Sequence, residues 1–232
     1  MSALGTLANQ NNKDQTYSPT QHEGYIMLKA SSIHHTPWNK GRLIGQKPPL
    51  KLQEVWSIRI RLEISKNYRD LALFNLAIDS KLRSCDLVKL KVIDIAHGSN
   101  ILSRAMVVQQ KTKRPVQFEV TPQTQRSLST WIETARLTSQ RYLFPSRCKR
   151  DDHITTRQYA RVVKSWLTLI GLRPEEYGTH SLRRTKATLI YRRTHNLRAV
   201  QILLGHTKLE STVRYLGIEV DDALEMAEQT EV

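Results

Sequence analysis

Cysteine is scarce in this sequence, and the two residues present lie far apart. Cys85 and Cys148 form no CxxC pair and have no pair of histidines near them. This argues against a disulfide framework and against a zinc module. The loops GxxxxGK[ST] and GxGxxG are also missing, which disfavours chemistry driven by a bound nucleotide. Any reaction that the protein performs is therefore expected to need no ATP and no NAD.

Long hydrophobic runs are missing as well. The sequence has no stretch of about 18 apolar residues and no signal-peptide core. A basic amphipathic helix with aromatic anchors, which would bind a membrane surface, is not found either. We therefore expect no membrane partner and a soluble protein in the cytoplasm.

Acidic residues are few relative to basic ones. The 36 Lys and Arg against 21 Asp and Glu give a net charge of +15 and a pI near 10.0. Six of the acids fall in residues 219–232, which contain no Lys or Arg. The remaining chain is strongly basic and should attract a polyanion such as DNA or RNA, with steeply salt-dependent binding.

Composition divides the chain into three parts. Residues 1–50 are polar and basic, and we expect them to form an extended arm without a fixed fold. Residues 51–218 have the periodic hydrophobic pattern of a folded domain, and residues 219–232 that of an acidic helix. Trp56, Trp131 and Trp166 are expected to anchor the core.

The periodicity predicts a mainly α (α+β) fold. Three short runs rich in β-branched or aromatic residues, 92–95, 105–108 and 116–120, predict a small three-stranded antiparallel meander. Helices are expected at 51–66, around 71–78, from 84, at 123–137, 156–170, 181–193 and 196–204, around Tyr215 and in the acidic tail.

Residues 178–185 suggest a site for a phosphate. His180 and Arg183 are three residues apart at the start of an expected helix, so both should leave the same side of its first turn. The N–H groups and positive dipole of a helix N-terminus also favour an anion.

A second group follows at 203–217. Gly205 can take the left-handed cap of a helix and place His206 just beyond it, and Tyr215 stands nine residues later. A phenol is a poor nucleophile until positive charge stabilises its oxyanion, so a tyrosine near Arg and His is a candidate nucleophile.

Upstream, Arg83 lies at an expected helix entrance and Lys111 lies in the turn between the second and third expected strands. A lysine on a hairpin could lie across a bound backbone and donate a proton. Lys113 or Arg114 could take this position instead.

The ordered set Arg83, Lys111, His180-x-x-Arg183, Leu-Gly-His206 and Tyr215 resembles the tyrosine recombinase (phage integrase) catalytic domain. The resemblance runs from about residue 52 to 220. It implies a site-specific DNA recombinase that cleaves and rejoins strands through a 3′-phosphotyrosine intermediate. It also implies that neither a metal ion nor a cofactor is required.

The resemblance implies a role for each residue. Tyr215 would attack the scissile phosphate, while Arg83, Arg183 and His206 would hold its oxygens as negative charge develops. Lys111 would protonate the leaving 5′-oxygen, and His180 would assist proton transfer at the tyrosine.

The resemblance also implies an assembly. Its members form tetramers on paired sites in double-stranded DNA and often pass a C-terminal helix to a neighbour. Val220, Leu224, Met226 and Ala227 could form the apolar face of such a helix. Residues 1–50 are too short and polar to be the usual N-terminal clamping domain, which another recombinase could supply.

Two departures from the family pattern occur near the first arginine. The usual glycine two residues before it is Lys81 here, and the common Glu three residues after it is Asp86.

Other functions remain open. Taken singly, each candidate could be an ordinary surface, capping or core residue, and Arg83 could pair with Asp86. A type IB topoisomerase uses a similar residue set to relax DNA as a monomer. A non-catalytic accessory protein could use the basic surface alone to bind DNA near the nucleoid.

Overall fold

The computed structural model describes residues 46–147 and 152–218, together with Leu224 and Glu228. The expected N-terminal arm lies outside the described residues except for 46–50. The expected acidic helix also lies outside them, except that Leu224 and Glu228 are both helical and Leu224 is exposed.

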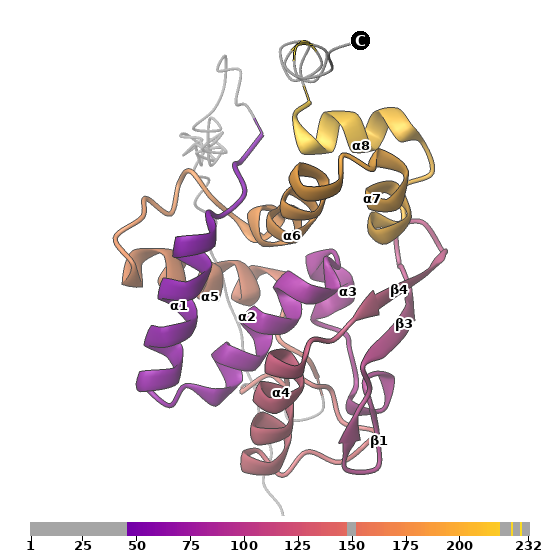
Figure 1. Ribbon diagram of the computed structural model, residues 1–232. Helices are drawn as coiled ribbons and strands as arrows, with labels where there is room; N and C mark the ends of the chain where they lie inside the picture. The colour runs from indigo at the N-terminus through magenta and orange to yellow at the C-terminus, as the bar shows by residue number, and fades with distance from the viewer. Residues whose placement is uncertain (1–45, 148–151, 219–223, 225–227, 229–232) are drawn as a thin grey trace, which may run out of the picture. The chain divides into compact units, whose positions relative to one another are not determined.

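The described residues are mostly helical, so the mainly α fold class is confirmed (Figure 1). None of the described helices has the length and hydrophobicity needed to span a bilayer. In chain order the elements are α1 (Leu52–Ile64), α2 (Tyr68–Ser80), α3 (Ser84–Leu87), the 3₁₀ turn η1 (Val92–Asp94), β1 (Ala96–His97), β2 (Asn100–Ile101), β3 (Arg104–Val108), β4 (Pro115–Glu119), α4 (Pro122–Thr134), α5 (Thr156–Leu169), α6 (Thr179–Thr194), α7 (Leu197–Leu204) and α8 (Leu209–Leu216).

Helix α2 forms the centre of the main core. All of its residues from Ala72 to Ser80 are buried, and α1, α4 and α6 pack against it. The Asn67 side chain caps its N-terminus by accepting a hydrogen bond from the Asp70 N–H at 3.3 Å. Phe74 on α2 meets Trp166 on α5 edge to face, with ring centroids 5.3 Å apart. The central position of α2 allows its C-terminal end to support the residues that follow it.

The small sheet differs from the expected three-stranded meander. The described residues contain two two-stranded antiparallel sheets, β1–β2 and β3–β4, and the run 92–95 belongs to neither. Val92 and Ile93 donate their N–H groups to the carbonyls of Arg141 and Ser139 at 3.0 and 2.9 Å, and the Asp94 carboxylate accepts the Lys91 N–H at 2.8 Å. Loop contacts and a side-chain cap thus use the donors that a strand ladder would need.

The tryptophan prediction holds for two of three residues. Trp166 is buried, and Trp131 is partly buried with its indole N–H donating to the Leu143 carbonyl at 2.8 Å. Trp56 is 48% exposed, so its assignment to the core was wrong. Val55, Ile58 and Leu62 form the buried face of α1, whereas an outer row repeats every four residues and consists of Leu52, Trp56, Ile60 and Ile64.

Helices α6, α7 and α8 pack together in the C-terminal half (Figure 1). Ala187, Val200 and Leu204 form a small second core, and Tyr215 and Leu216 of α8 pack on it. The β3–β4 hairpin contacts α7 through β4. These contacts bring α6, α8 and the hairpin, which carry most of the candidate residues, into one region.

Candidate active site

The N-terminus of α6 holds His180 and Arg183, as the sequence predicts. Gly178 is the N-cap, and its N–H donates to the Ser181 hydroxyl at 3.1 Å. Arg183 is only 3% exposed. One of its Nη atoms donates to the Leu204 carbonyl at 2.7 Å and the other to the Lys81 carbonyl. Two backbone carbonyls therefore fix this guanidinium before any ligand binds.

His206 follows the C-terminus of α7. Gly205 caps α7 at φ +65°, which confirms the predicted left-handed cap. The His206 N–H donates to the Gln201 carbonyl at 3.1 Å. Its ring Nδ1 lies 3.1 Å from the hydroxyl of Thr212, a fully buried residue on α8. This contact orients the imidazole toward Tyr215.

Tyr215 lies in the last turn of α8 among cationic and imidazole groups. The centroid of its ring is 5.3 Å from that of His206. The guanidinium carbons of Arg183 and Arg184 lie 5.9 and 5.0 Å from the same centroid. The phenol hydroxyl is 3.4 Å from the His180 carbonyl oxygen. A cleft of about 540 Å³ opens beside this tyrosine, between His180, Arg184 and Arg214.

Arg83 joins this group through Gln109. Arg83 is the N-cap of α3, and its Nη1 donates to the Gln109 side-chain oxygen. The fully buried Gln109 amide donates in turn to the Leu204 carbonyl at 3.3 Å, the oxygen that also accepts from Arg183. The two predicted arginines therefore belong to one hydrogen-bond network.

Lys111 stays at the edge of the site. It is exposed in the turn between β3 and β4, as predicted, and its charge contributes to lowering the pKa of His180. Lys113 lies in the same turn with φ +55°, and its N–H donates to the Gln109 carbonyl at 2.8 Å.

The crowding of positive groups has different effects on the two histidines and on the tyrosine. Desolvation and then the charges of Arg183 and Arg184 lower the pKa of His180. Burial and then the charges of Arg183 and Arg83 lower the pKa of His206 to about 4, so both imidazoles are neutral at pH 7. Burial raises the pKa of the Tyr215 phenol, while the charges of Arg183 and Arg184 oppose that rise. The site is therefore electropositive because of its guanidinium groups.

The sequence interpretation missed Arg184, Gln109 and Thr212. Arg184 is adjacent to Arg183, but nothing in the local pattern indicates that its guanidinium meets the Tyr215 ring. Gln109 and Thr212 are ordinary polar residues that acquire a role only through their contacts. Gln109 contacts Leu204, which is 95 residues away, and Thr212 contacts His206, which is 6 residues away.

Lys81 accounts for one departure from the family pattern. Its backbone is left-handed, with φ +53°, the conformation that a glycine at this position would adopt most easily. Its side chain is completely buried, and the ammonium donates to both Glu119 carboxylate oxygens at 3.0 Å. Lys186 on α6 also binds Glu119, and it binds Asp79 on α2. The lysine thus ties the segment before Arg83 to β4.

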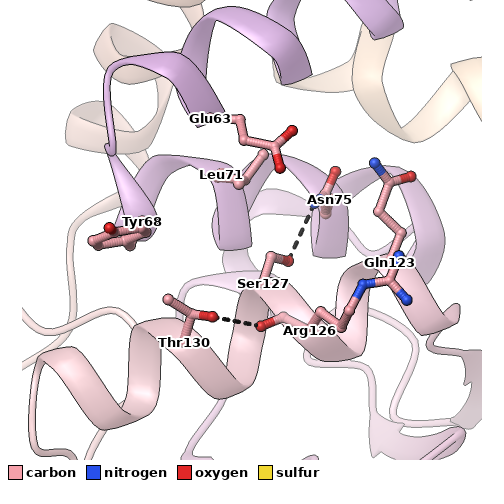
Figure 2. A pocket seen from close by; sticks show the side chains of 8 residues that line it. All are labelled: Glu63, Tyr68, Leu71, Asn75, Gln123, Arg126, Ser127 and Thr130. Carbon is pink, nitrogen blue, oxygen red and sulfur yellow. Dashed lines mark hydrogen bonds between the residues drawn. The ribbon is translucent and has the colours of Figure 1, made fainter.

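A second hollow, of about 240 Å³, lies between α1, α2 and α4 and includes Asn75, Arg126 and Ser127 (Figure 2). The Asn75 amide donates to the Ser127 hydroxyl at 3.1 Å. None of the predicted site residues lines it. In the part of the chain that the structure describes, no group of three or more His, Cys, Asp or Glu side chains is arranged to hold a metal ion. The cluster around Tyr215 is therefore the candidate active site.

Comparison with known proteins identifies the family. The model of the phage integrase family matches residues 50–220. The chain belongs to the phage integrase family. Among curated members, this integrase-family chain is 29% identical over 175 residues to the probable integrase/recombinase YoeC of Bacillus subtilis, covering 75% of this chain and 91% of YoeC. It is 30% identical over 158 residues to a tyrosine recombinase of Pseudothermotoga lettingae, covering 68% of this chain and 52% of that protein.

A solved structure has the same fold. The site-specific recombinase XerH, in a post-cleavage complex with a palindromic difH substrate, matches with a TM-score of 0.61 and 22% identity, covering 78% of this chain and 52% of XerH. Although this integrase-family chain covers nearly all of YoeC, it spans about half the length of several other curated tyrosine recombinases that it matches.

Proposed function

We propose that this chain is a site-specific recombinase that cleaves and rejoins DNA strands through a covalent bond between Tyr215 and a backbone phosphate. The observation that carries the proposal is the position of the Tyr215 ring, which lies 5.3 Å from His206 and 5.9 Å from the Arg183 guanidinium. Membership of the phage integrase family supports it. The net charge of +15 supports a DNA partner.

The first step is an attack by the phenol oxygen of Tyr215 on the scissile phosphorus. A bond forms between this oxygen and phosphorus, and the bond from phosphorus to the 5′-oxygen breaks. His180 accepts the phenolic proton, a role that suits a histidine whose lowered pKa keeps it neutral. Lys111 donates a proton to the 5′-oxygen as it leaves. The products are a 3′-phosphotyrosine and a free 5′-hydroxyl.

Arg83, Arg183 and His206 bind the non-bridging oxygens of the phosphate. The pentacoordinate transition state carries additional negative charge, and planar guanidinium groups match its oxygens with paired hydrogen bonds. The network through Gln109 and the Leu204 carbonyl holds both guanidinium groups in advance, which reduces reorganisation during the reaction. Neutral His206 contributes as a hydrogen-bond donor.

The reverse reaction rejoins DNA without an added energy source. The phosphotyrosine bond conserves the energy of the phosphodiester, so an incoming 5′-hydroxyl can displace the tyrosine and restore the strand. Exchange requires two duplexes, and we infer a tetramer on paired DNA sites at the nucleoid.

Covalent trapping tests the proposal directly. The full chain would be incubated with a pool of duplexes of random sequence, each nicked near a potential scissile phosphate so that the cleaved fragment diffuses away. We expect a protein–DNA adduct that survives denaturation, and sequencing of the captured fragments identifies the site. Tyr215→Phe should give no adduct, whereas Tyr191→Phe, on the partly buried face of α6, should trap DNA normally.

The role of Arg183 calls for a variant that keeps the charge. Arg183→Lys preserves a cation but loses the two-pronged guanidinium, and we expect cleavage to fall on the order of 100-fold. Affinity for DNA should change little, because one phosphate contact among many contributes a small part of binding. An equal loss of affinity and cleavage would contradict this role. Absence of any adduct with the wild-type chain would refute the proposed function.

A further inference from the structure

Arg184 places a second guanidinium against the nucleophile. Its guanidinium carbon lies 5.0 Å from the centroid of the Tyr215 ring, closer than that of Arg183 at 5.9 Å. Arg184 is 7% exposed, so its charge is largely removed from solvent screening. A buried cation at this distance from an aromatic ring attracts the ring and stabilises negative charge on it. Nothing in the mechanism above uses this residue.

The segment before α1 holds Arg184 in place. One Nη atom donates to the Lys47 carbonyl at 2.7 Å and the other to the side-chain oxygen of Gln46. The Gln46 amide nitrogen donates to the Arg214 carbonyl on α8 at 2.5 Å. A single glutamine side chain therefore links Arg184 on α6 to the residue that precedes Tyr215.

This segment is itself anchored to the domain. The Lys47 ammonium donates to the Tyr177 carbonyl at 2.6 Å, and the Leu50 N–H donates to the Thr185 hydroxyl at 3.0 Å. Leu50 is 3% exposed and belongs to the main hydrophobic core. Residues 46–50 are thus fixed at several points, and they can orient the arginine that they bind.

The Nε–H of Arg184 is buried and has no hydrogen-bond partner among the described residues. A buried donor without a partner destabilises the folded state by about 1–3 kcal/mol. A packing role alone could be filled by a neutral side chain without that cost. The charge of Arg184 is therefore better explained by its electrostatic effect on the phenol of Tyr215.

We propose that Arg184 is a positioning residue for the nucleophile: it holds the Tyr215 ring against α6 and favours ionisation of the phenol, and Gln46 keeps Arg184 in the required orientation. This inference rests on the proposed function and adds a residue to its mechanism.

The other charged groups facing Tyr215 already have tasks. On α6, Arg183 is bound to two backbone carbonyls and His180 is neutral at pH 7. His206, between α7 and α8, is also neutral, and Arg83 before α3 is bound to Gln109. The charge of Arg183 and then that of Arg184 oppose the rise in the pKa of Tyr215 that burial causes, and of these two only Arg184 is not assigned to the phosphate. Lys47 and Arg214 also line the cleft beside Tyr215, but the Lys47 ammonium donates to the Tyr177 carbonyl and Arg214 is exposed. Arg184 is therefore the buried cation left for the phenolate.

A titration without DNA tests the effect on the phenol. The ultraviolet absorbance of tyrosinate is followed with pH in the full chain and in Tyr215→Phe, and the difference gives the titration of Tyr215. The same difference is taken in an Arg184→Gln background. We expect Arg184→Gln to move the titration to higher pH and Arg184→Lys to restore part of the shift. Arg193→Gln, an exposed arginine on the same helix, should leave it unchanged. An unmoved Tyr215 titration in Arg184→Gln would overturn the inference.

Cleavage of the trapped DNA sequence gives the second readout. In single-turnover trapping, Arg184→Gln should cleave about 10- to 100-fold more slowly at neutral pH and recover part of this loss as the pH rises. Gln46→Ala leaves the core intact and should cause a smaller loss that is not additive with Arg184→Gln, because both changes remove the same contact.

The two proposals fail in different ways. If the wild-type chain traps DNA and Arg184→Gln cleaves at the wild-type rate and with the wild-type pH dependence, the role of Arg184 is refuted and the proposed function stands. If the wild-type chain traps no DNA, the proposed function fails, whereas the DNA-free titration still decides whether Arg184 acts on the phenol. Circular dichroism at each pH confirms that the compared variants are folded.

Discussion

Substitution of Gly205 by alanine should destabilise the protein for two separable reasons. Gly205 ends α7 in the left-handed conformation, with φ +65°, and a β-carbon added there would lie 2.5 Å from Cγ2 of Val116. It would also lie 3.1 Å from the side-chain oxygen of Gln109. Both neighbours are buried in the β3–β4 hairpin region, so neither can move easily.

The magnitude follows from these two terms. A left-handed alanine costs about 1–2 kcal/mol, and forcing an extra carbon into a packed site costs about 1–3 kcal/mol more. The total of about 2–5 kcal/mol is a large part of the 5–15 kcal/mol typical of a folded domain. Gly171 provides a matched control, because it has φ +79° but no atom within 4 Å of its added β-carbon. Gly171→Ala should therefore show only the conformational term.

Urea denaturation of both variants measures the free energy of unfolding. We expect Gly205→Ala to be less stable than Gly171→Ala by about 1–3 kcal/mol. The double variant Gly205→Ala with Val116→Ala should be more stable than the sum of the single changes predicts, because Val116→Ala removes the clashing methyl group. Equal destabilisation at Gly205 and Gly171 would refute the claim that the hairpin packs rigidly against this cap.

Three other predictions concern the site and its supports. Thr212→Val removes the hydroxyl next to His206 Nδ1 while nearly preserving shape, so cleavage in the trapping assay should fall about tenfold or more, and Thr212→Ser should retain activity. The pKa of His206 is lowered to about 4, so between about pH 4 and 6.5 this histidine binds more protons in the unfolded chain than in the folded chain. The free energy of unfolding, measured in urea, should therefore decline as the pH falls from about 6.5 to about 4, and His206→Gln should weaken that decline. The Asp79 carboxylate accepts hydrogen bonds from Thr121, Thr124 and Lys186. In urea denaturation, Asp79→Asn should lower the free energy of unfolding by about 3 kcal/mol. The control Glu133→Gln, at an exposed residue, should lower it by less than about 0.5 kcal/mol.

Local sequence signals predicted the helices and the places of several site residues at helix ends. The cap at Gly205 and the shared first turn of His180 and Arg183 follow from spacing along one helix, which the chain encodes locally. The run at 92–95 shows where such signals fail, because the N–H groups of Val92 and Ile93 bind carbonyls almost fifty residues later in the sequence. A period-two pattern cannot reveal those partners.

Trp56 and Arg184 illustrate the same limit for side chains. The size of Trp56 favoured burial, but α1 turns a different apolar face toward the core. Arg184 acquires its place through Gln46 and Lys47, which lie well over a hundred residues away. The roles assigned to Arg83, Lys111, His180, Arg183, His206 and Tyr215 stay predictions until the variants are tested.

The Leu204 carbonyl has a consequence for how this protein can be altered. Because that one oxygen accepts hydrogen bonds from both Gln109 and Arg183, the register of β3 relative to α7 is fixed where the hairpin turn begins. Residues 110–114 lie beyond that point, and Thr112 and Lys113 donate hydrogen bonds back to Gln109. Insertions or deletions in the turn would therefore change the reach of Lys111 and remove contacts that hold Gln109. A one-residue shift before Gln109 would instead separate Arg83 from Arg183. The length of the hairpin is therefore constrained by the contacts of Gln109 on both sides of the turn.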